Sequence, residues 1–329
     1  MKSVRFGVLS TAKIGRQKVI PAMQQGELIN VTAIASRNAE RAQATAEELG
    51  IDNAYGSYEE LLEDADVDAV YIPLPNHLHV EWAIKALEAG KHVLCEKPIG
   101  LDADDARRLV RAAADHPKLK VMEAFMYRFH PQWQRAYDLV AEGAIGELRA
   151  IHSTFSYFND DPDNVRNQAD IGGGALMDIG CYCISLARFL FDREPERVSG
   201  DMKIDPDFET DYLTSGVMDF GRGTSTFVCA TQLAPHQNVD VFGSEGKITI
   251  EIPFNAPPNE STRIRHTRGG ETEEITFDAT NQYTVQGERF ARAVLEDAAV
   301  PTPLSDAAAN MDVIDAIRRS AERGAWVVV

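Results

Sequence analysis

Cysteine, cationic side chains and long apolar runs are all scarce in this sequence. The 329 residues include four cysteines and no Cys-x-x-Cys pair, which argues against a disulfide scaffold and a zinc site. Lys and Arg number 33 against 51 Asp and Glu, so the net charge of −18 excludes a general attraction for nucleic acid or anionic membranes. No run approaches the roughly 18 apolar residues of a membrane helix, and Arg5 and Gly7 interrupt the amino-terminal stretch, unlike a signal peptide. We therefore expect a soluble, cytoplasmic protein with no metal.

The first 124 residues alternate short apolar runs with segments of helical spacing. Continuously apolar strands between helices indicate a parallel sheet covered on both faces, which is the doubly wound Rossmann arrangement. The chain length predicts two domains at roughly 100–200 residues each, and 44% hydrophobic residues suffice for both cores. The expected strands are residues 4–10, 31–35, 67–72, 92–95 and 119–123.

The pattern changes after residue 124, and residues 125–329 predict an α+β domain. Alternating apolar and polar residues indicate a large open sheet, mainly antiparallel, with a tight connection at 243–246 and a hairpin turn at Gly269 and Gly270. A glycine run at 172–174 leads into a helix over 175–191. Further helices are expected at 131–142, 283–297 and 305–324.

A phosphate-binding turn is expected directly after the first strand. The dinucleotide fingerprint G-x-G-x-x-G aligns here as Ser10-x-Ala12-x-x-Gly15, with small residues in place of two glycines. Small side chains still let the backbone approach a pyrophosphate, although an ordinary strand-to-helix turn has the same pattern. The expected nucleotide contacts in this turn are Ser10, Thr11, Ala12, Lys13 and Ile14.

The end of the second predicted strand lacks the acidic residue that binds an adenosine ribose. Ser36 and Arg37 stand there instead, with Arg41 one helical turn onward. A hydroxyl and a cationic guanidinium suit a 2′-phosphate, so the pattern favours NADP over NAD. The alternative is that Arg37 only solvates the surface.

The fourth predicted strand ends at Glu96 and Lys97. Ligands of open α/β sheets bind outside the carboxyl ends of the strands, where a lysine can hydrogen-bond a hydroxyl and assist its deprotonation. Lysine is also common in ordinary loops, so position alone leaves both interpretations open.

Taken together, these features resemble the glucose-fructose oxidoreductase/inositol dehydrogenase (Gfo/Idh/MocA) family over essentially the whole chain. The resemblance implies that Lys97 contacts the reacting hydroxyl and the nicotinamide ribose, and that Asp178 and Tyr182 complete the catalytic and substrate site. Many members have histidine at the position of Tyr182, and the tyrosine is similar to the glucose-fructose oxidoreductase, dihydrodiol dehydrogenase and D-xylose dehydrogenase branch. The matching segments are residues 7–15, 73–79, 96–98, 123–128 and 172–182.

Residue chemistry is compatible with these implied roles. Asp178 and Tyr182 are four residues apart at a predicted helix start and so share one face. A free tyrosine titrates near 10, and a nearby ammonium such as that of Lys97 would lower this pKa, so that Tyr182 exchanges the alcohol proton. The alternative is a core tyrosine and a capping aspartate.

Other polar residues are weaker candidates. His77 and His79 follow a strand end, where cofactor contact is favoured over a metal pair because no third ligand is evident. Arg128 and Arg166 either contact the nicotinamide or substrate or pair with carboxylates, and Tyr283 is a candidate substrate contact. The remaining expected cofactor contacts are Pro73, Leu74, Asn76, Glu96 and Lys97.

The sequence thus predicts an NADP-preferring oxidoreductase that transfers a hydride between the nicotinamide and a sugar or polyol hydroxyl or carbonyl. The branch resemblance favours an aldose such as D-xylose or glucose. The alternatives are an NAD-assisted glycosidase and a non-catalytic NADP sensor on the same scaffold. Family members associate through the second-domain sheet, which implies a homodimer or homotetramer.

Overall fold

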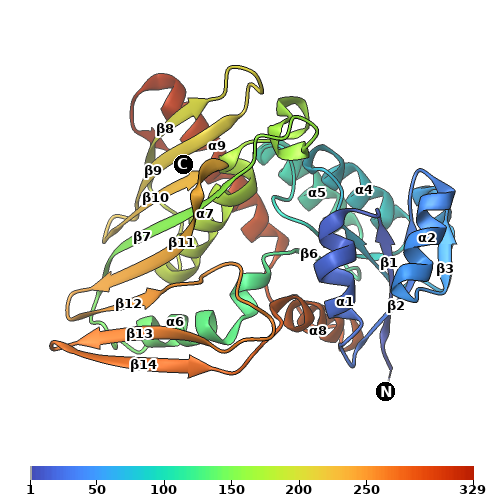
Figure 1. Cartoon of the computed structure of the whole chain (residues 1–329), viewed down its shortest axis with the longest axis horizontal. Coiled ribbons are helices and arrows are strands. Elements are labelled where there is room, and N and C mark those ends of the chain that lie inside the picture. The colour runs from blue at the N-terminus through green and yellow to red at the C-terminus, as the bar shows by residue number, and fades with distance from the viewer. Residues whose placement is uncertain (1) are drawn as a thin grey trace. The chain divides into compact units, whose positions relative to one another are not determined.

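The computed structural model describes residues 2–329, and their contacts separate into two compact units (Figure 1). Unit 1 contains the residues up to Met126 together with Gln282–Ala308, and unit 2 contains Tyr127–Asn281 and Ala309–Val329. The sequence placed residues 282–308 in the second domain, and the structure corrects this. Helix α8 (Gln282–Leu295) packs against strands of unit 1, and the carboxylate of Glu288 accepts a 2.9 Å hydrogen bond from the Leu28 amide.

Unit 1 is built on a six-stranded parallel sheet in the order β3-β2-β1-β4-β5-β6. This confirms the Rossmann prediction, with one additional edge strand, β3, that the sequence pattern did not indicate. Its strands are β1 (Val4–Leu9), β2 (Ile29–Ala35), β3 (Asn53–Tyr55), β4 (Ala69–Ile72), β5 (His92–Cys95) and β6 (Val121–Glu123). Its helices besides α8 are α1 (Ile20–Met23), α2 (Ala39–Leu49), α3 (Tyr58–Glu63), α4 (Asn76–Glu88) and α5 (Ala103–Asp115).

Side-chain caps set the starts of three of these helices as the sequence indicates. Asn38, Ser57 and Asp102 each accept a hydrogen bond from the backbone amide three residues onward, at the starts of α2, α3 and α5. Gly50 ends α2 with a φ of +65°, a conformation that glycine adopts without steric cost. Local chemistry therefore fixes where these helices begin next to the sheet.

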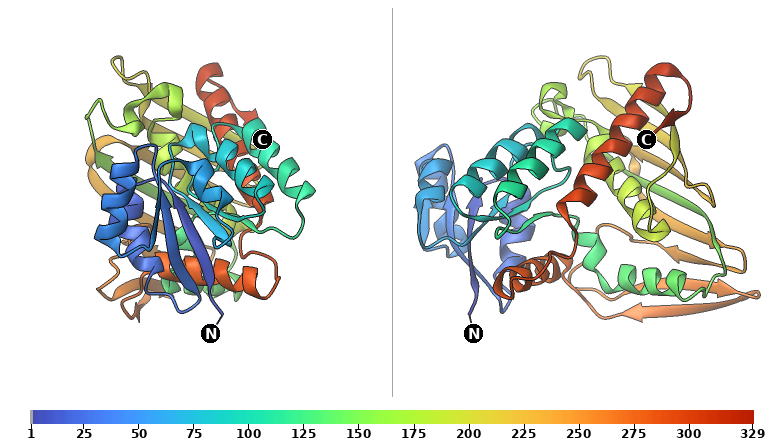
Figure 2. Two further views of the ribbon diagram at one scale, coloured as in Figure 1. Left: turned by 90° about the vertical axis from the view of Figure 1, so that its right-hand side faces the viewer. Right: turned by 180° about the vertical axis from the view of Figure 1, so that it is seen from behind.

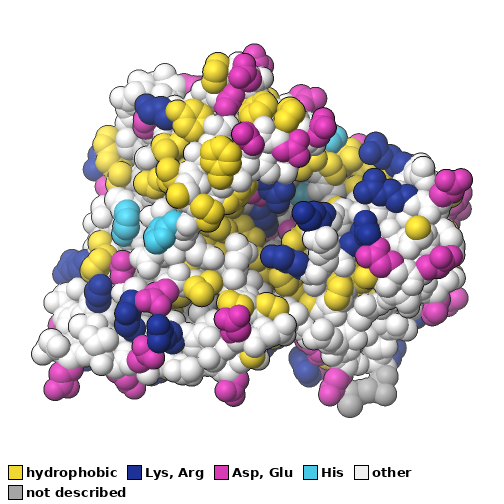
Figure 3. All heavy atoms as spheres, viewed as in Figure 1, with side chains coloured by type: hydrophobic (Ala, Val, Ile, Leu, Met, Phe, Trp, Pro, Cys, Tyr) yellow, Lys and Arg dark blue, Asp and Glu magenta, His cyan; other side chains and the backbone are white. Residues whose placement is uncertain are grey.

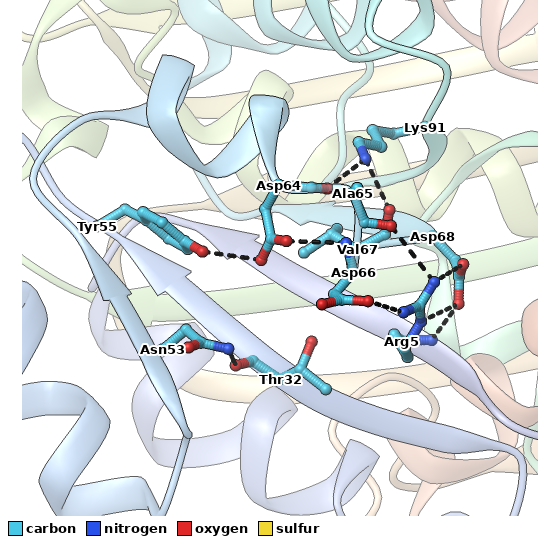
Figure 4. A network of polar contacts seen from close by, with 10 residues as sticks. All are labelled: Arg5, Thr32, Asn53, Tyr55, Asp64, Ala65, Asp66, Val67, Asp68 and Lys91. Atoms are coloured by element: carbon cyan, nitrogen blue, oxygen red, sulfur yellow. Dashed lines mark hydrogen bonds and ion pairs between the residues drawn. The ribbon is translucent and has the colours of Figure 1, made fainter.

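Ion pairs lie at the amino-terminal ends of the parallel strands (Figure 4). Ligands of such sheets bind at the opposite, carboxyl-terminal ends. The guanidinium of Arg5 contacts Asp66 at 2.6 Å and Asp68 at 2.8 Å. Hydrogen bonding from Arg5 lowers the pKa of Asp68 despite partial burial. The ammonium of Lys91 donates to the carbonyl oxygens of Asp64 and Val67. Ion pairs and hydrogen bonds thus connect the chain at the amino-terminal strand ends, where none of the predicted site residues lies.

Unit 2 contains a nine-stranded mixed sheet in the order β14-β13-β12-β11-β7-β10-β9-β8-β15. Strands β7 and β10 pair in parallel and the other neighbours run antiparallel, which confirms the predicted sheet class. The strands are β7 (Leu148–Phe158), β8 (Arg197–Ile204), β9 (Asp211–Asp219), β10 (Thr224–Ala230), β11 (Gln232–Gly243), β12 (Gly246–Ile250), β13 (Thr262–Arg268), β14 (Glu271–Phe277) and β15 (Val327–Val328).

Helices α6 (Pro131–Ala141) and α7 (Cys181–Phe191) cover one face of this sheet (Figures 1 and 2). Helix α9 (Leu304–Arg323) begins in unit 1 and continues into unit 2.

One segment, Ala169–Phe191, is long and apolar enough to cross a membrane, contrary to the expectation that no segment approaches this limit. However, 89% of its apolar window is buried inside the protein, as in a core helix.

Candidate active site

The turn after β1 has an unusual backbone at the first fingerprint position. Ser10 adopts a φ of +136°, in a region that glycine occupies readily and serine rarely does. Its Oγ accepts a 3.0 Å hydrogen bond from the Ala12 amide, which holds the turn. A π-helical turn, Gly15–Val19, follows and leads into α1. Such irregular turns are frequent at functional sites, and strain in a loop is retained where function requires the conformation.

A second group of polar residues follows β2. The Oγ of Ser36 accepts from the Asn38 amide at 3.3 Å, which leaves its hydroxyl hydrogen to donate elsewhere. Arg37 and Arg41 are exposed, and Arg41 lies in the first turn of α2. Figure 3 shows several Lys and Arg side chains gathered on the face of unit 1 that it presents. Exposed guanidinium groups beside a hydroxyl form a suitable anion site.

Glu96 and Lys97 follow β5 at the carboxyl edge of the sheet. The Oε1 of Glu96 accepts a 2.7 Å hydrogen bond from the hydroxyl of Tyr71, a fully buried residue on β4. Burial and the charge of Glu96 raise the pKa of Tyr71, which therefore stays a donor. Tyr283 lies on α8 in the same unit, and burial and Glu96 raise its pKa as well. The hydroxyl of Tyr71 thus holds the carboxylate next to Lys97.

His79 occupies a different environment from the one expected of a cofactor contact. Its side chain is fully buried, with Nδ1 2.8 Å from the carbonyl oxygen of Pro98 and Nε2 2.7 Å from that of Leu74. Burial lowers its pKa to about 4, although the two carbonyls favour the protonated ring. Both ring nitrogens are thus engaged by backbone carbonyls, and direct contact with a cofactor stays a prediction. His79 ties the loop after β4 to the turn that contains Lys97, and His77 stays half-buried nearby.

The glycine run of unit 2 is required by close approach. A Cβ on Gly173 would lie 2.6 Å from the carbonyl oxygen of Arg166, and Gly174 has a φ of +110° with no room beside Asp211. The Oδ2 of Asp211 accepts from the Leu176 amide at 2.8 Å and from the Thr214 hydroxyl at 2.6 Å. A carboxylate from β9 therefore caps the helix that the glycine run opens, a role the sequence had offered to Asp178 as an alternative.

Asp178 lies in a π-helical turn, Leu176–Gly180, directly before α7. Its Oδ2 accepts a 2.6 Å hydrogen bond from the hydroxyl of Tyr157 and lies 2.8 Å from the Nε of Arg166. Burial and the charge of Asp178 raise the pKa of Tyr157, so this phenol remains protonated and donating. The pKa of Arg166 is raised chiefly by Asp178. Two cationic or donating groups thus fix one carboxylate oxygen, and Arg166 is engaged in an ion pair.

Tyr182 lies one turn beyond Asp178, in the first turn of α7. The residue is 5% exposed, and its ring packs against those of Phe254 at 5.3 Å, Tyr127 at 5.7 Å and Phe155 at 5.8 Å between centroids. This aromatic packing fixes the ring position. The Tyr157 hydroxyl donates to Asp178, and the ring of Tyr182 stands one helical turn beyond that carboxylate.

The side chain of Arg128 is buried and contacts Ser185 and Phe189 of helix α7. Its side chain is 8% exposed, and its Nη2 donates to the Oγ of Ser185 at 2.8 Å and to the Ser185 carbonyl oxygen at 3.3 Å. The guanidinium also lies over the ring of Phe189 at 5.4 Å. These contacts do not support the expected cofactor role. Among residues 2–329, no group of three or more His, Cys, Asp and Glu is arranged to hold a metal ion.

The contact between Tyr157 and Asp178 was not predicted from the sequence. Tyr157 was only one of three aromatic residues on a strand, and its direction became clear from the strand register.

Comparison with known proteins shows which protein family the chain resembles in both of its units. Residues 4–125 match an oxidoreductase family with an NAD-binding Rossmann fold, and residues 133–249 match the GFO/IDH/MocA C-terminal domain. The chain is 47% identical to an uncharacterized oxidoreductase of Rhizobium meliloti over 100% of both chains. It is 41% identical to a D-xylose 1-dehydrogenase (NADP(+)) of Haloferax volcanii over 98% of each chain.

Solved structures also match the chain over almost its whole length. A 3-ketoreductase from Actinomadura kijaniata in complex with NADP and TDP-benzene superposes with a TM-score of 0.90 at 34% identity, over 97% of this chain and 98% of that one. Structures of that enzyme include variants with a lysine changed to alanine and a tyrosine changed to phenylalanine.

Proposed function

The chain belongs to the GFO/IDH/MocA oxidoreductase family, and on that premise we propose that it transfers a hydride between NADP and a sugar hydroxyl or carbonyl. The observation that carries the proposal is Asp178 held by Tyr157 and Arg166, with Tyr182 one helical turn onward. A protein that only senses a nucleotide has no need of a fixed carboxylate beside a proton-exchanging phenol.

The chain's residues fit a nicotinamide nucleotide. The Ser10 turn has a glycine-like backbone, and Arg37 and Arg41 are exposed beside Ser36 with no carboxylate at the end of β2. We propose that the Ser10–Ile14 turn holds the pyrophosphate and that Ser36, Arg37 and Arg41 hold the 2′-phosphate of NADP. The bound nucleotide would supply the hydride acceptor or donor at C4 of its nicotinamide.

The roles of the catalytic residues follow from their chemistry. In the oxidation direction, the hydroxyl O–H proton passes to the phenolate of Tyr182 and the carbon-bound hydrogen leaves as a hydride. The role proposed for Lys97 is electrostatic, because its ammonium can stabilise negative charge that develops on a reacting hydroxyl. The carboxylate of Asp178, held on one oxygen by Tyr157 and Arg166, orients a substrate hydroxyl. Reduction of a carbonyl reverses each step.

An aldose such as D-xylose or glucose is the proposed substrate. The support is the named activity of the Haloferax relative, together with the tyrosine at position 182. The glycosidase and sensor alternatives find no support among these relatives. We also propose a cytoplasmic homodimer or homotetramer that associates through the sheet of unit 2.

Absorbance at 340 nm tests the function directly. Purified protein is mixed with NADP or NAD and a panel of aldoses, polyols and cyclic diols, and NADPH formation with an aldose is expected. Lys97→Ala and Tyr182→Phe should lose most turnover while still binding NADP, whereas Tyr137→Phe, a phenol stacked on Phe189 in the same unit, should retain it. Silence in both reaction directions despite NADP binding would refute the dehydrogenase and favour the sensor or glycosidase.

A further inference from the structure

Gly180 brings the π-helical turn that carries Asp178 very close to the sheet of unit 2. The residue is buried, and the turn packs against strand β10. A Cβ atom on Gly180 would lie 2.8 Å from the Sγ of Cys229 on that strand and 3.0 Å from the Cδ1 of Leu176. The leucine methyl group ends a flexible side chain and can turn aside, but the thiol is fully buried on a short side chain. The absence of a side chain at position 180 is therefore matched to the volume of the Cys229 sulfur.

Cys229 belongs to the face of the sheet that also holds Asp178. It pairs with Phe155 across the parallel strands β10 and β7, and Tyr157 follows two residues later on the same face of β7. The hydroxyl of Tyr157 donates to the Oδ2 of Asp178 at 2.6 Å. A packing contact and a hydrogen bond thus join one turn to one face of the sheet, and both require the same separation between them.

The tolerance of this arrangement is small. Non-bonded heavy atoms approach to about 3.5–4.0 Å, so a methyl group at position 180 must move the turn and Cys229 apart by roughly 1 Å. Because Tyr157 reaches Asp178 from the same face of the sheet, a displacement of roughly 1 Å takes the 2.6 Å contact beyond the range of a hydrogen bond. The carboxylate would then lose this donor and the orientation that it provides.

We propose that Gly180 and Cys229 form a positioning pair, which sets the separation between turn and sheet at which Asp178 meets the hydroxyl of Tyr157. The inference rests on the proposed function, because it concerns the carboxylate that orients the sugar hydroxyl. The pair acts on the reaction only through the position of this carboxylate. Cys229 contributes its volume and not its reactivity, since burial raises the pKa of the thiol and keeps it protonated.

Steady-state kinetics and NADP binding of the full chain test the pair. Gly180→Ala should lower kcat for the aldose at least about tenfold, because the carboxylate loses one hydrogen bond and its exact position. The NADP Kd should stay at the wild-type value, since the proposed phosphate contacts lie in unit 1. In Gly180→Ala/Cys229→Ala, the new methyl group occupies the space that the sulfur leaves, so kcat should recover to the value of Cys229→Ala alone.

A second background separates positioning from folding. Tyr157→Phe already lacks the hydrogen bond to Asp178. Adding Gly180→Ala to this variant should therefore lower kcat by less than about twofold more, because the two changes act on the same contact. A residue needed only for folding would lower kcat by the full factor again.

Gly180→Ala/Cys183→Ala is the matched control. Cys183 is a fully buried thiol three residues onward on α7, and its sulfur is not among the atoms nearest to the added methyl group. Its removal frees the same volume without relieving the contact with Cys229. The kcat of this variant should therefore stay at the low value of Gly180→Ala.

Three results with an active wild type would overturn the inference by itself. These are a wild-type kcat in Gly180→Ala, a loss that Cys229→Ala repairs no better than Cys183→Ala, and a full additional loss in the Tyr157→Phe background. If Gly180→Ala alone does not fold, the double variant decides: a folded Gly180→Ala/Cys229→Ala with the kcat of Cys229→Ala supports the pair, and an unfolded one overturns it. A wild type without turnover in either direction would instead overturn the proposed function, and the role of the pair with it.

Discussion

Asp211 should make the stability of the protein depend on pH in an unusual direction. This carboxyl is 5% exposed, and burial raises its pKa from 3.8 to about 6, against the hydrogen bonds from Thr214 and Leu176. A raised pKa means that the folded protein holds this proton more tightly than the unfolded chain. Stability from this group is thus fully present below about pH 4 and is lost as the pH rises through about 6.

The magnitude follows from linkage. The difference between 3.8 and about 6, at about 1.36 kcal/mol per pH unit, amounts to about 3 kcal/mol of unfolding free energy. In Asp211→Asn the amide oxygen can still accept from Leu176 and Thr214, but the group no longer titrates. The wild type should therefore lose about 2.4 kcal/mol of this stability relative to the variant between pH 4 and pH 7.

Urea unfolding followed by circular dichroism, at half-unit steps from pH 4 to pH 7, measures this difference. Comparing wild type with variant at each pH cancels the titration of every other carboxylate. A constant difference across the range would refute the reasoning, because the buried carboxyl would then ionise as it does in the unfolded chain. A wild type that gains stability relative to the variant as the pH rises would show that hydrogen bonding, not burial, controls this group.

Three further changes test the site. Arg37→Asp should shift the ratio of kcat/KM for NADP over NAD toward NAD by about tenfold or more, because a carboxylate repels the 2′-phosphate; an unchanged ratio would remove Arg37 from this role. Tyr157→Phe removes one of the two groups that hold Oδ2 of Asp178 and should lower kcat about tenfold with an unchanged NADP Kd; wild-type kcat would show that Arg166 alone suffices. His79→Gln cannot reach both carbonyls, so calorimetry should record a loss of about 1–3 kcal/mol of stability, and unchanged stability would contradict the clamp.

Much of the Rossmann unit was predictable because its strands are buried on both faces. The strand β4 is buried at every residue and reads as an uninterrupted apolar run, and the caps at Asn38 and Ser57 act through bonds within one turn. The strand Asn53–Tyr55 was not predictable in this way. Its three residues are exposed or half-buried, so its pairing with β2 leaves no hydrophobic signal.

The polar residues of the candidate site fall into two groups: those indicated by a local sequence pattern and those whose contacts depend on the fold. Asp178 and Tyr182 were found through a motif and a helical spacing that are both local. Tyr157 was not, because its contact with Asp178 depends on the register of β7 within the sheet. The contacts of His79 with the carbonyl oxygens of Pro98 and Leu74 were not predictable either, because they depend on how two loops pack together and not on the residue type at a strand end.

The positions where local rules fail coincide with the proposed chemistry. Ser10 has a glycine-like φ of +136°, a π-helical turn follows it at Gly15–Val19, and Asp178 lies in a second π-helical turn, Leu176–Gly180. Asp211 is a buried carboxyl whose ionisation opposes folding, and yet it caps the helix that positions Asp178. Each of these features costs stability where an ordinary turn, helix or apolar residue would not. The proposed function gives these features a physical reason, since a nucleotide and a carboxylate must be held in fixed positions there.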